Sequence, residues 1–366
     1  MSEILEARPS VQAAKLRIID SDIHPSLRSE ADLNPYLSER WRRHIAEYGK
    51  LGRGPYAARN TYPRFQPFLA RRDAFPPNGG PPGSDLDFMR QQLLDFYDIE
   101  YGILEPLMPS NLVRNLELSV ALCSAINDWQ VEAFTSRERR LRASIQIPFE
   151  DAKAAVAEID RRVANRDFAQ IQLTSRSTEP LGRPRYWPIF EAAAHHGLPI
   201  GLHIGGEAGY APTAAGWPSF YIEDHHGLSH SMQCQVTSMV LEGVFERFPS
   251  LKIIMIEGGF AWLPPLAWRL DRHWEKMRGE VPQLKRPPST YMRQNLWVST
   301  QPMEEPEDPE DVRRLLARIG WDRVLFATDY PHWDFDDPRH AFPCQLSEAE
   351  RRAIFRGNAE AIYRFD

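Results

Sequence analysis

The chain has 366 residues, of which 42% are hydrophobic, enough for a large core in either two domains or one barrel with insertions. Its formal net charge is -6 and it has no long basic run, which argues against nucleic-acid binding. No stretch approaches the roughly 20 consecutive apolar residues that a membrane-spanning helix needs.

The N-terminal segment and the cysteines bear on the cellular compartment. Residues 1–15 are polar and of mixed charge, and they lack the apolar centre of a secretory signal peptide. Cys123, Cys234 and Cys344 lie far apart and form no Cys-x-x-Cys pair, which is typical of reduced thiols. We therefore expect a cytoplasmic protein that binds a small-molecule substrate and neither nucleic acid nor membrane.

Short apolar runs alternate with helical patterns along the whole chain. The strand-like runs lie at 17–23, 100–104, 142–147, 168–173, 198–203, 252–257, 295–299 and 323–328. The helical patterns lie at 36–48, 86–97, 111–137, 150–166, 186–196, 230–248, 260–278, 309–319 and 347–363. Eight strands that alternate with helices predict a (β/α)8 barrel, the TIM barrel, as a single domain over residues 1–366.

Two long segments interrupt this pattern. Residues 25–86 form an insertion after the first strand, and its part from Gly52 to Gly83 is rich in proline, glycine and arginine. A loop of this length is unusual in a compact domain unless it is functional, so we expect it to cover the mouth of the site or to dock on a partner subunit. Arg72 in this loop could clamp a substrate carboxylate, or it could be a solvated charge. The second segment is a long loop over residues 205–227 after the fifth strand.

Four of the strand-like runs end in side chains that commonly bind metals. The first ends in Asp22 and His24, the fifth in His203, the sixth in Glu257 and the eighth in Asp329. The C-terminal strand ends of a barrel meet at its active-site face, so we expect these side chains to lie together. One such aspartate alone could be a helix cap or half of a salt bridge, but four similar endings indicate a shared metal site.

The donor types indicate which metal this site prefers. Imidazole and carboxylate ligands without a nearby cysteine suit one divalent transition-metal ion, Zn²⁺ by preference and otherwise Mn²⁺ or Fe²⁺. Asp22 and His24 lie two residues apart on a strand, so their side chains point to the same side and can share the ion. Asp20 points the same way but lies deeper, and we interpret it as structural.

At this point the sequence resembles the amidohydrolase-related family, which includes aminocarboxymuconate-semialdehyde decarboxylase and aromatic-acid decarboxylases. The resemblance rests on Asp22-Ile-His24, His203, Gly243-Val-Phe-Glu-Arg-Phe-Pro-Ser-Leu-Lys252, Glu257-Gly-Gly259 and Thr328-Asp-Tyr-Pro331. It extends from about residue 17 to the C-terminus and is weakest over 25–85 and 205–227. It implies a metal held by Asp22, His24, His203 and Asp329, and a homodimer or homotetramer.

Two departures from the family pattern affect the expected reaction. Many relatives carry His-x-His or Glu-x-His on the first strand, whereas this chain carries Asp22-Ile-His24, with a shorter carboxylate reach. Decarboxylating relatives usually carry a catalytic histidine at the position of Glu257. A glutamate here could act as a general base on a metal-activated water, and it would repel a carboxylate substrate.

We therefore expect a metal-dependent hydrolase that acts on a small carbonyl or carboxylate compound, with Glu257 and Asp329 as catalytic residues. The alternative is a metal-dependent non-oxidative decarboxylase, a carboxy-lyase, of a small aromatic or unsaturated carboxylic acid. A non-enzymatic alternative is a metal-bearing binding protein whose two proline-rich loops form an oligomer interface.

The remaining candidates are expected substrate contacts: His332, His230, Arg72 and Trp262. His332 follows Asp329 closely in a loop at the mouth. His230 belongs with His225 and His226 to a dense group, one of which could reach the metal or the substrate if the group does not simply face solvent. Trp262 could line an apolar pocket or pack in the core. For Glu257, the structural alternative is a salt bridge to Arg269.

Overall fold

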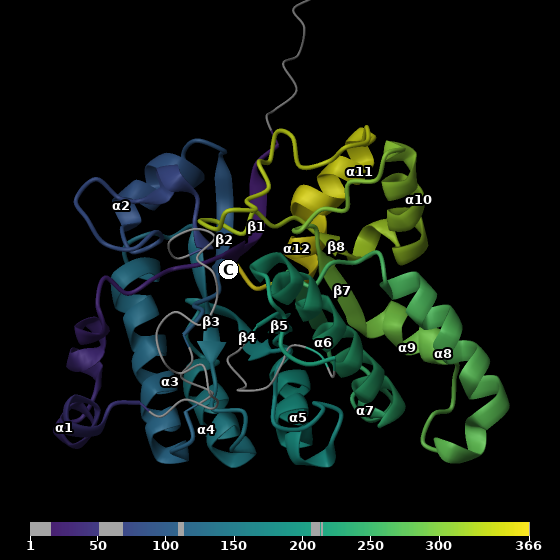
Figure 1. Ribbon diagram of the computed structural model, residues 1–366, viewed down its shortest axis with the longest axis horizontal. Coiled ribbons are helices and arrows are strands. Elements are labelled where there is room, and N and C mark those ends of the chain that lie inside the picture. The colour runs from purple at the N-terminus through teal and green to yellow at the C-terminus, as the bar shows by residue number, and fades with distance from the viewer. Residues whose placement is uncertain (1–15, 51–68, 109–112, 206–212, 214, 366) are drawn as a thin grey trace, which may run out of the picture.

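The computed structural model describes residues 16–50, 69–108, 113–205, 213 and 215–365. Eight parallel strands follow one another in sequence order around a nearly closed barrel, and the helices lie outside it (Figure 1). The strands are β1 (Ile18–Ile23), β2 (Ile99–Leu104), β3 (Leu141–Gln146), β4 (Phe168–Thr174), β5 (Ile200–His203), β6 (Ile253–Ile256), β7 (Leu296–Ser299) and β8 (Val324–Leu325). The predicted (β/α)8 architecture is confirmed.

The helices cover the outside of the strands and extend beyond them. They are α1 (Glu39–Tyr48), α2 (Leu86–Met89), α3 (Leu116–Gln130), α4 (Ala152–Arg162), α5 (Trp187–His196), α6 (Tyr221–Leu241), α7 (Val244–Arg247), α8 (Leu263–Met277), α9 (Pro288–Asn295), α10 (Pro309–Ile319), α11 (Glu348–Arg352) and α12 (Asn358–Ile362). None of the helices in the described ranges combines the length and the apolar character needed to cross a membrane. The three cysteines are free, as predicted.

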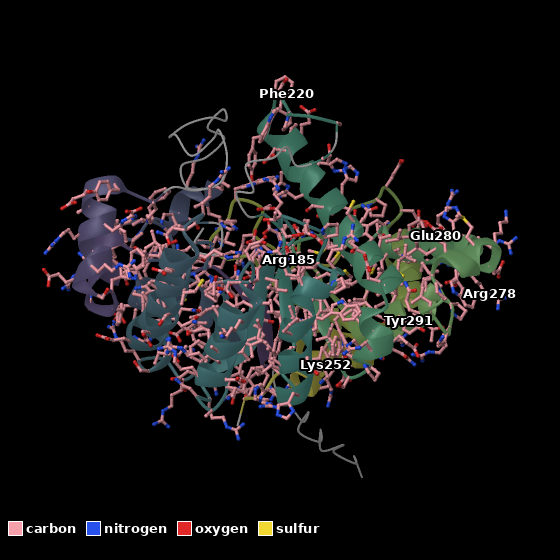
Figure 2. The ribbon with its side chains drawn as sticks, turned by 90° about the horizontal axis from the view of Figure 1, so that it is seen from below. Arg185, Phe220, Lys252, Arg278, Glu280 and Tyr291 are labelled. Carbon is pink, nitrogen blue, oxygen red and sulfur yellow. The ribbon has the colours of Figure 1, made fainter. Side chains whose placement is uncertain are left out.

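Helix α6 differs most from the sequence prediction. It begins at Tyr221, within the segment 205–227 that we expect to be a loop, and it ends at Leu241, before Gly243 with its φ of 82° starts the short α7. Its first turns project from the body of the molecule, with Phe220 at the far end (Figure 2). A helix is recognised in a sequence by an apolar stripe that faces the core. The first turns of α6 lack such a stripe, and their Ile222 is exposed.

The barrel wall is buried on both faces. Ile254 and Ile256 of β6 pack inside the barrel with Ile19 and Leu325, whereas Ile253 and Met255 of the same strand join the core beneath the helices. Residues of the C-terminal segment, including Ile362 and Tyr363, complete the inner cluster. This double burial explains why the strands read as continuous apolar runs rather than as alternating patterns.

Backbone and side-chain hydrogen bonds close the barrel between β8 and β1. Ser21 N–H donates to the Phe326 carbonyl (2.9 Å), and His24 N–H donates to the Tyr330 carbonyl (2.7 Å). The buried Asp20 carboxylate accepts from Thr328 N–H (2.9 Å) and Thr328 Oγ1–H (2.6 Å), and also from Asp22 N–H (3.2 Å). Asp20 thus joins β1 to the segment that follows β8, which agrees with its expected structural role.

We expect Asp20→Ala to lower the free energy of unfolding by about 3 kcal/mol, because it leaves buried N–H and O–H donors without acceptors. Urea-induced unfolding of the two proteins measures the difference. Asp20→Asn keeps one side-chain oxygen for the two N–H donors, so it should lower the free energy of unfolding by only about 1 kcal/mol. Equal stability of Asp20→Ala and the parent protein would show that Asp20 does not hold the seam.

Candidate metal centre

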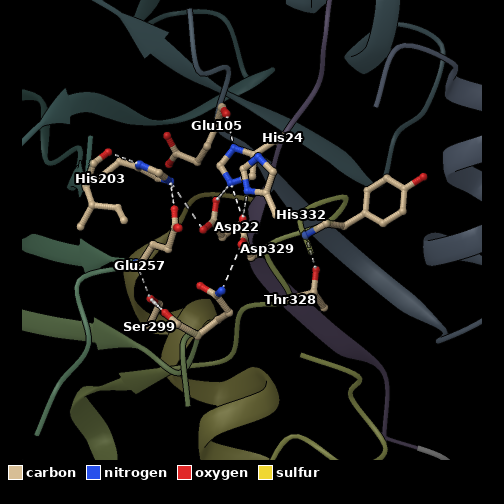
Figure 3. Close-up of polar contacts among 12 residues, drawn as sticks. Asp22, His24, Glu105, His203, Glu257, Ser299, Thr328, Asp329 and His332 are labelled. Carbon is tan, nitrogen blue, oxygen red and sulfur yellow. Dashed lines mark hydrogen bonds and ion pairs between the residues drawn. The ribbon is translucent and has the colours of Figure 1, made fainter. Parts of the chain in front are cut away.

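The four predicted metal ligands gather around His24 at the C-terminal end of the barrel (Figure 3). Donor atoms of Asp22, His24, His203 and Glu257 form one group, and Asp329 belongs to an adjoining group with His24, Glu257 and His332. His24 Nε2 is 3.1 Å from Asp22 Oδ1 and 2.8 Å from Asp329 Oδ1, and His203 Nε2 is 3.8 Å from Asp22 Oδ2. All four side chains are buried. The strand ends of a (β/α)8 barrel converge, so residues about 300 positions apart in sequence meet here.

Both histidines of this cluster are held in one orientation by a backbone carbonyl. His24 Nδ1 lies 2.6 Å from the Glu105 carbonyl oxygen, and His203 Nδ1 lies 2.6 Å from the Ile204 carbonyl oxygen. A carbonyl oxygen only accepts, so each Nδ1 carries the proton and each Nε2 can offer its lone pair to the cluster. This is the usual way in which proteins fix metal-binding histidines.

The polar atoms at the centre of the cluster lack ordinary partners. Apart from imidazole–carboxylate contacts within the cluster, both oxygens of Asp22 and Nε2 of His24 and of His203 make no hydrogen bond with any described residue, although all are buried. Burial alone would lower the pKa of His24, but the carboxylates of Asp22 and Asp329 outweigh it and raise the pKa well above its usual range. A donor set of two carboxylates and two imidazoles that attracts positive charge fits a divalent transition-metal ion.

Glu257 lies directly after β6, at the edge of the cluster. Its Oε2 is 3.1 Å from His203 Nε2 and its Oε1 is 3.4 Å from His225 Nε2, so its contacts are with histidines and not with Arg269. Burial would raise the pKa of Glu257, but the imidazoles of His203 and His225 beside its carboxylate lower it well below its usual range. Glu257 is therefore ionised, with its charge directed at two imidazoles.

Glu257 and Asp329 share an uncommon backbone conformation. Their φ angles are 57° and 60°, in the left-handed region that costs a non-glycine residue free energy. Such conformations persist where surrounding structure enforces them, and they cluster at functional sites. Here the strained backbone ends β6 and turns the chain after β8, which directs both carboxylates into the cluster.

His332 lies over the ring of His24 and is hydrogen-bonded to Asp329. The two rings are stacked with centroids 4.3 Å apart, and His332 Nδ1 is 2.6 Å from Asp329 Oδ1. Burial and the neighbouring His24 lower the pKa of His332 well below its usual range, so its ring is neutral. For Asp329, burial and the charge of Glu257 raise the pKa well above its usual range. The pair can therefore hold a proton between them.

A cavity of about 220 Å³ opens onto this cluster. Its charged and imidazole-bearing surface comprises His203, Glu257, His332, His225, Asp224 and Asp334. Its apolar wall comprises Leu69, Pro106, Leu107, Met108, Ile204, Leu228 and Trp333, with Gln146, Gln172 and Thr174 as neutral polar groups. No lysine or arginine is among the described residues that line it. The volume lies below the range of about 300–1,000 Å³ typical of drug-sized ligands, so the cavity suits a small molecule.

Three expected substrate contacts lie elsewhere. Arg72 is exposed and does not line the cavity; its neighbour Arg71 instead pairs with Asp73 and lies over the ring of Phe335 (4.4 Å to the centroid). His230 and Trp262 line a second cavity of about 350 Å³, which shares only His225 and Glu257 with the first. Sequence spacing gives the element on which a side chain lies, but not which of two neighbouring cavities it faces.

The insertion reaches the site through its end. Leu69 lines the cavity, and its carbonyl accepts from Trp333 N–H (2.9 Å), while Arg71 N–H donates to the Pro331 carbonyl (2.9 Å). This end of the insertion therefore lies along the loop after β8, at the mouth of the cavity. Most of the tract from Gly52 onwards, including Arg64, lies outside the described residues.

Two further groups at the site were not predicted. Glu105, directly after β2, is buried beside His24; its side chain accepts from Gln170 Nε2, and burial raises its pKa well above the usual range. Glu105 ends an apolar run before Pro106, so it carries the same strand-end signal as the metal ligands. Asp334 lies in the loop after β8, two residues beyond His332, and no local pattern in the sequence distinguishes it.

Comparisons with known proteins agree with this geometry. The amidohydrolase family model matches residues 19–365. Gamma-resorcylate decarboxylase of Polaromonas sp. (strain JS666 / ATCC BAA-500) is 25% identical over 293 residues, which cover 77% of this chain and 88% of that protein.

Two solved structures share the fold. An amidohydrolase from Mycobacterium avium subsp. paratuberculosis K-10 superposes with a TM-score of 0.72 at 23% identity, covering 96% of this chain and 100% of that one. A dihydroxybenzoic acid decarboxylase from Polaromonas sp. JS666, with bound manganese and the inhibitor 2-nitroresorcinol, gives a TM-score of 0.66 at 21% identity, covering 94% and 96%. Because the family model spans almost the whole chain, the protein belongs to the amidohydrolase family.

Proposed function

We propose that this enzyme is a metal-dependent, non-oxidative decarboxylase of a small aromatic or unsaturated carboxylic acid. The observation that carries the proposal is the match to gamma-resorcylate decarboxylase over 88% of that protein's length, together with a metal-type cluster beneath a small, largely apolar cavity. These observations favour decarboxylation, which was the alternative expected from the sequence, over hydrolysis. Manganese in a solved dihydroxybenzoic acid decarboxylase supports a divalent metal and makes Mn²⁺ as good a candidate as Zn²⁺.

The cavity suits a flat acid whose carboxylate is neutralised at the metal-binding end. Its apolar wall would take the ring, while the described lining offers no lysine or arginine for a carboxylate. The positive charge must then come from the metal-binding end. A divalent cation held by Asp22, His24, His203 and Asp329 would bind substrate oxygens and stabilise negative charge as it develops in the transition state.

Glu257 does not oppose such a substrate as strongly as its charge suggests. It lies 3.1 Å from His203 and 3.4 Å from His225, so two imidazoles lie directly against its carboxylate where it lines the cavity. His225 in turn faces the cavity and can donate to a substrate oxygen. The expected repulsion between Glu257 and an anionic substrate is therefore reduced by its neighbours.

The pair of Asp329 and His332 is placed to handle the proton. Decarboxylation breaks the bond between the ring carbon and the carboxylate carbon, and the electron pair stays on the ring carbon as CO₂ leaves. That carbon then takes a proton, which the short contact between His332 Nδ1 and Asp329 Oδ1 (2.6 Å) can supply at the cavity surface. Stacking on His24 holds the His332 ring in place meanwhile.

One observation favours hydrolysis as a second candidate. Glu257 is ionised and within reach of the cluster, which suits a general base that takes a proton from water. In that reaction the acyl group of an ester or lactone would accept the water oxygen, and no carbon would be lost.

Isotope labelling separates the two reactions. With 2,6-dihydroxybenzoate and other small aromatic acids in D₂O, we expect equimolar CO₂ and a product with one deuterium at the vacated carbon. The His203→Ala protein in parallel excludes contaminating activity. Incorporation of ¹⁸O from labelled water into products of esters or lactones, without CO₂ release from any acid, would instead establish a hydrolase.

A further inference from the structure

A second group of metal-type donors adjoins the first. His225 extends from α6, Glu257 follows β6, and Asp334 lies in the loop after β8. His225 Nε2 is 3.4 Å from Glu257 Oε1 and 3.5 Å from Asp334 Oδ2. Three elements far apart in the sequence thus place one donor atom each around a common point.

These donors are buried and poorly satisfied. The side chains of His225, Glu257 and Asp334 are 19%, 8% and 13% exposed. His225 Nε2 and Asp334 Oδ2 are inaccessible and make no hydrogen bond with any residue in the described ranges. Buried polar atoms normally have partners, so two unsatisfied atoms that face each other beside a buried carboxylate require an explanation.

The spacing of the donors fits a metal ion better than direct hydrogen bonds. Distances of 3.4 and 3.5 Å exceed the usual N–H···O range of about 2.7–3.2 Å. Ligand atoms about 2.1 Å from a tetrahedral zinc ion lie about 3.4 Å from one another. The two distances from His225 Nε2 therefore match the separation of ligands around an ion, and all three donor atoms lie within 4.8 Å of one another.

The two oxygens of Glu257 serve different neighbours. Oε2 is 3.1 Å from His203 Nε2 in the first cluster, and Oε1 is 3.4 Å from His225 Nε2 in the second. A carboxylate that presents one oxygen to each of two donor groups is the arrangement that bridges paired metal ions, which lie about 3.5–4 Å apart in enzymes.

We propose that His225, Glu257 and Asp334 bind a second divalent transition-metal ion, with Glu257 as the bridge to the first. The proposal rests on the metal site in the proposed function, and it gives the glutamate at this position a role in metal binding. Three protein ligands leave coordination positions open on an ion whose ligands all line the substrate cavity. The second ion would thus bring a further positive charge to a cavity wall whose described residues include no lysine or arginine.

Metal stoichiometry tests this directly. The full-length protein is reconstituted with Mn²⁺ or Zn²⁺, freed of loose ions by gel filtration and subjected to elemental analysis. We expect two ions per chain in the parent and one in both His225→Ala and Asp334→Asn. His340→Ala serves as the control, because His340 is exposed in the same loop as Asp334 and should retain two ions.

Electron paramagnetic resonance of the Mn²⁺ forms gives an independent readout. The parent should show magnetic coupling between two ions, and Asp334→Asn should show the spectrum of an isolated ion. One ion in the parent, unchanged in both variants, would overturn the second site and leave the proposed function intact. No ion in the parent would overturn both, and loss of both ions from folded Asp334→Asn would overturn its assignment to a separate site.

Discussion

His203→Ala will lower the metal content by one ion per chain and reduce kcat/KM by at least about a thousandfold, since metal-ion stabilisation of a transition state is worth several kcal/mol. His203 is buried at the end of β5, and its tautomer is fixed by the Ile204 carbonyl 2.6 Å away. Alanine removes Nε2 and leaves no other side chain on this strand to replace it. Elemental analysis and steady-state kinetics measure the two effects.

The control is His195→Ala, which removes a histidine from the exposed surface of α5. It should keep both the metal and the activity of the parent. If His203→Ala retained its full metal content and a near-normal rate, the cluster would be a polar network that holds strand ends together, and the proposed mechanism would fail.

His332→Phe should reduce kcat by about 100- to 10,000-fold, the range typical of lost acid–base catalysis. Phenylalanine can keep the ring stacked on His24 but cannot bond to Asp329 Oδ1, so the change removes the proton-holding contact and little packing. Metal content should stay at the parent level, which distinguishes this variant from His203→Ala. Rates come from CO₂ release and metal content from elemental analysis.

The same kinetics separate proton transfer from substrate binding. A kcat loss with KM within a few fold of the parent would place His332 in the chemical step. A raised KM with an unchanged kcat would make His332 only a wall of the cavity, and Asp329 alone would then have to deliver the proton.

The barrel and the central cluster can be predicted from the sequence because both depend on local signals. An apolar run that ends in Asp, His or Glu marks a buried strand with a polar end, and barrel topology brings such ends together. Asp22, His24, His203 and Asp329 meet for this reason. Glu105 obeys the same rule, because it follows β2 directly and precedes Pro106.

Helix α9 and the first turns of α6 could not be predicted from the sequence, and each case has a physical reason. The segment 287–295 begins with two prolines and suggests a linker, yet proline fits the first turn of a helix, and α9 starts there. The first turns of α6 project from the barrel, so they show no apolar face, and the sequence predicts a loop. His225 lies on that unpredicted helix.

The residues around the central cluster depend on tertiary packing. Arg71 turns inward over Phe335 while Arg72 faces solvent, and nothing in the pair Arg-Arg distinguishes them. Asp334 reaches His225 only because α6 and the loop after β8 pack against each other, as the contact between Trp333 Nε1 and Tyr221 Oη (3.1 Å) shows. Such contacts between non-neighbouring elements leave no periodic trace in the sequence.

Because the described lining of the cavity contains no lysine or arginine, binding of the metal ion and binding of the anionic substrate are coupled. An anionic acid entering the metal-free site would meet several buried carboxylates and little fixed positive charge, so the empty site should exclude it. Once an ion is bound, the same acid neutralises part of its charge, and each then raises the affinity for the other by the same factor. Retention of the ion and recognition of the acid are thus two expressions of a single coupling free energy.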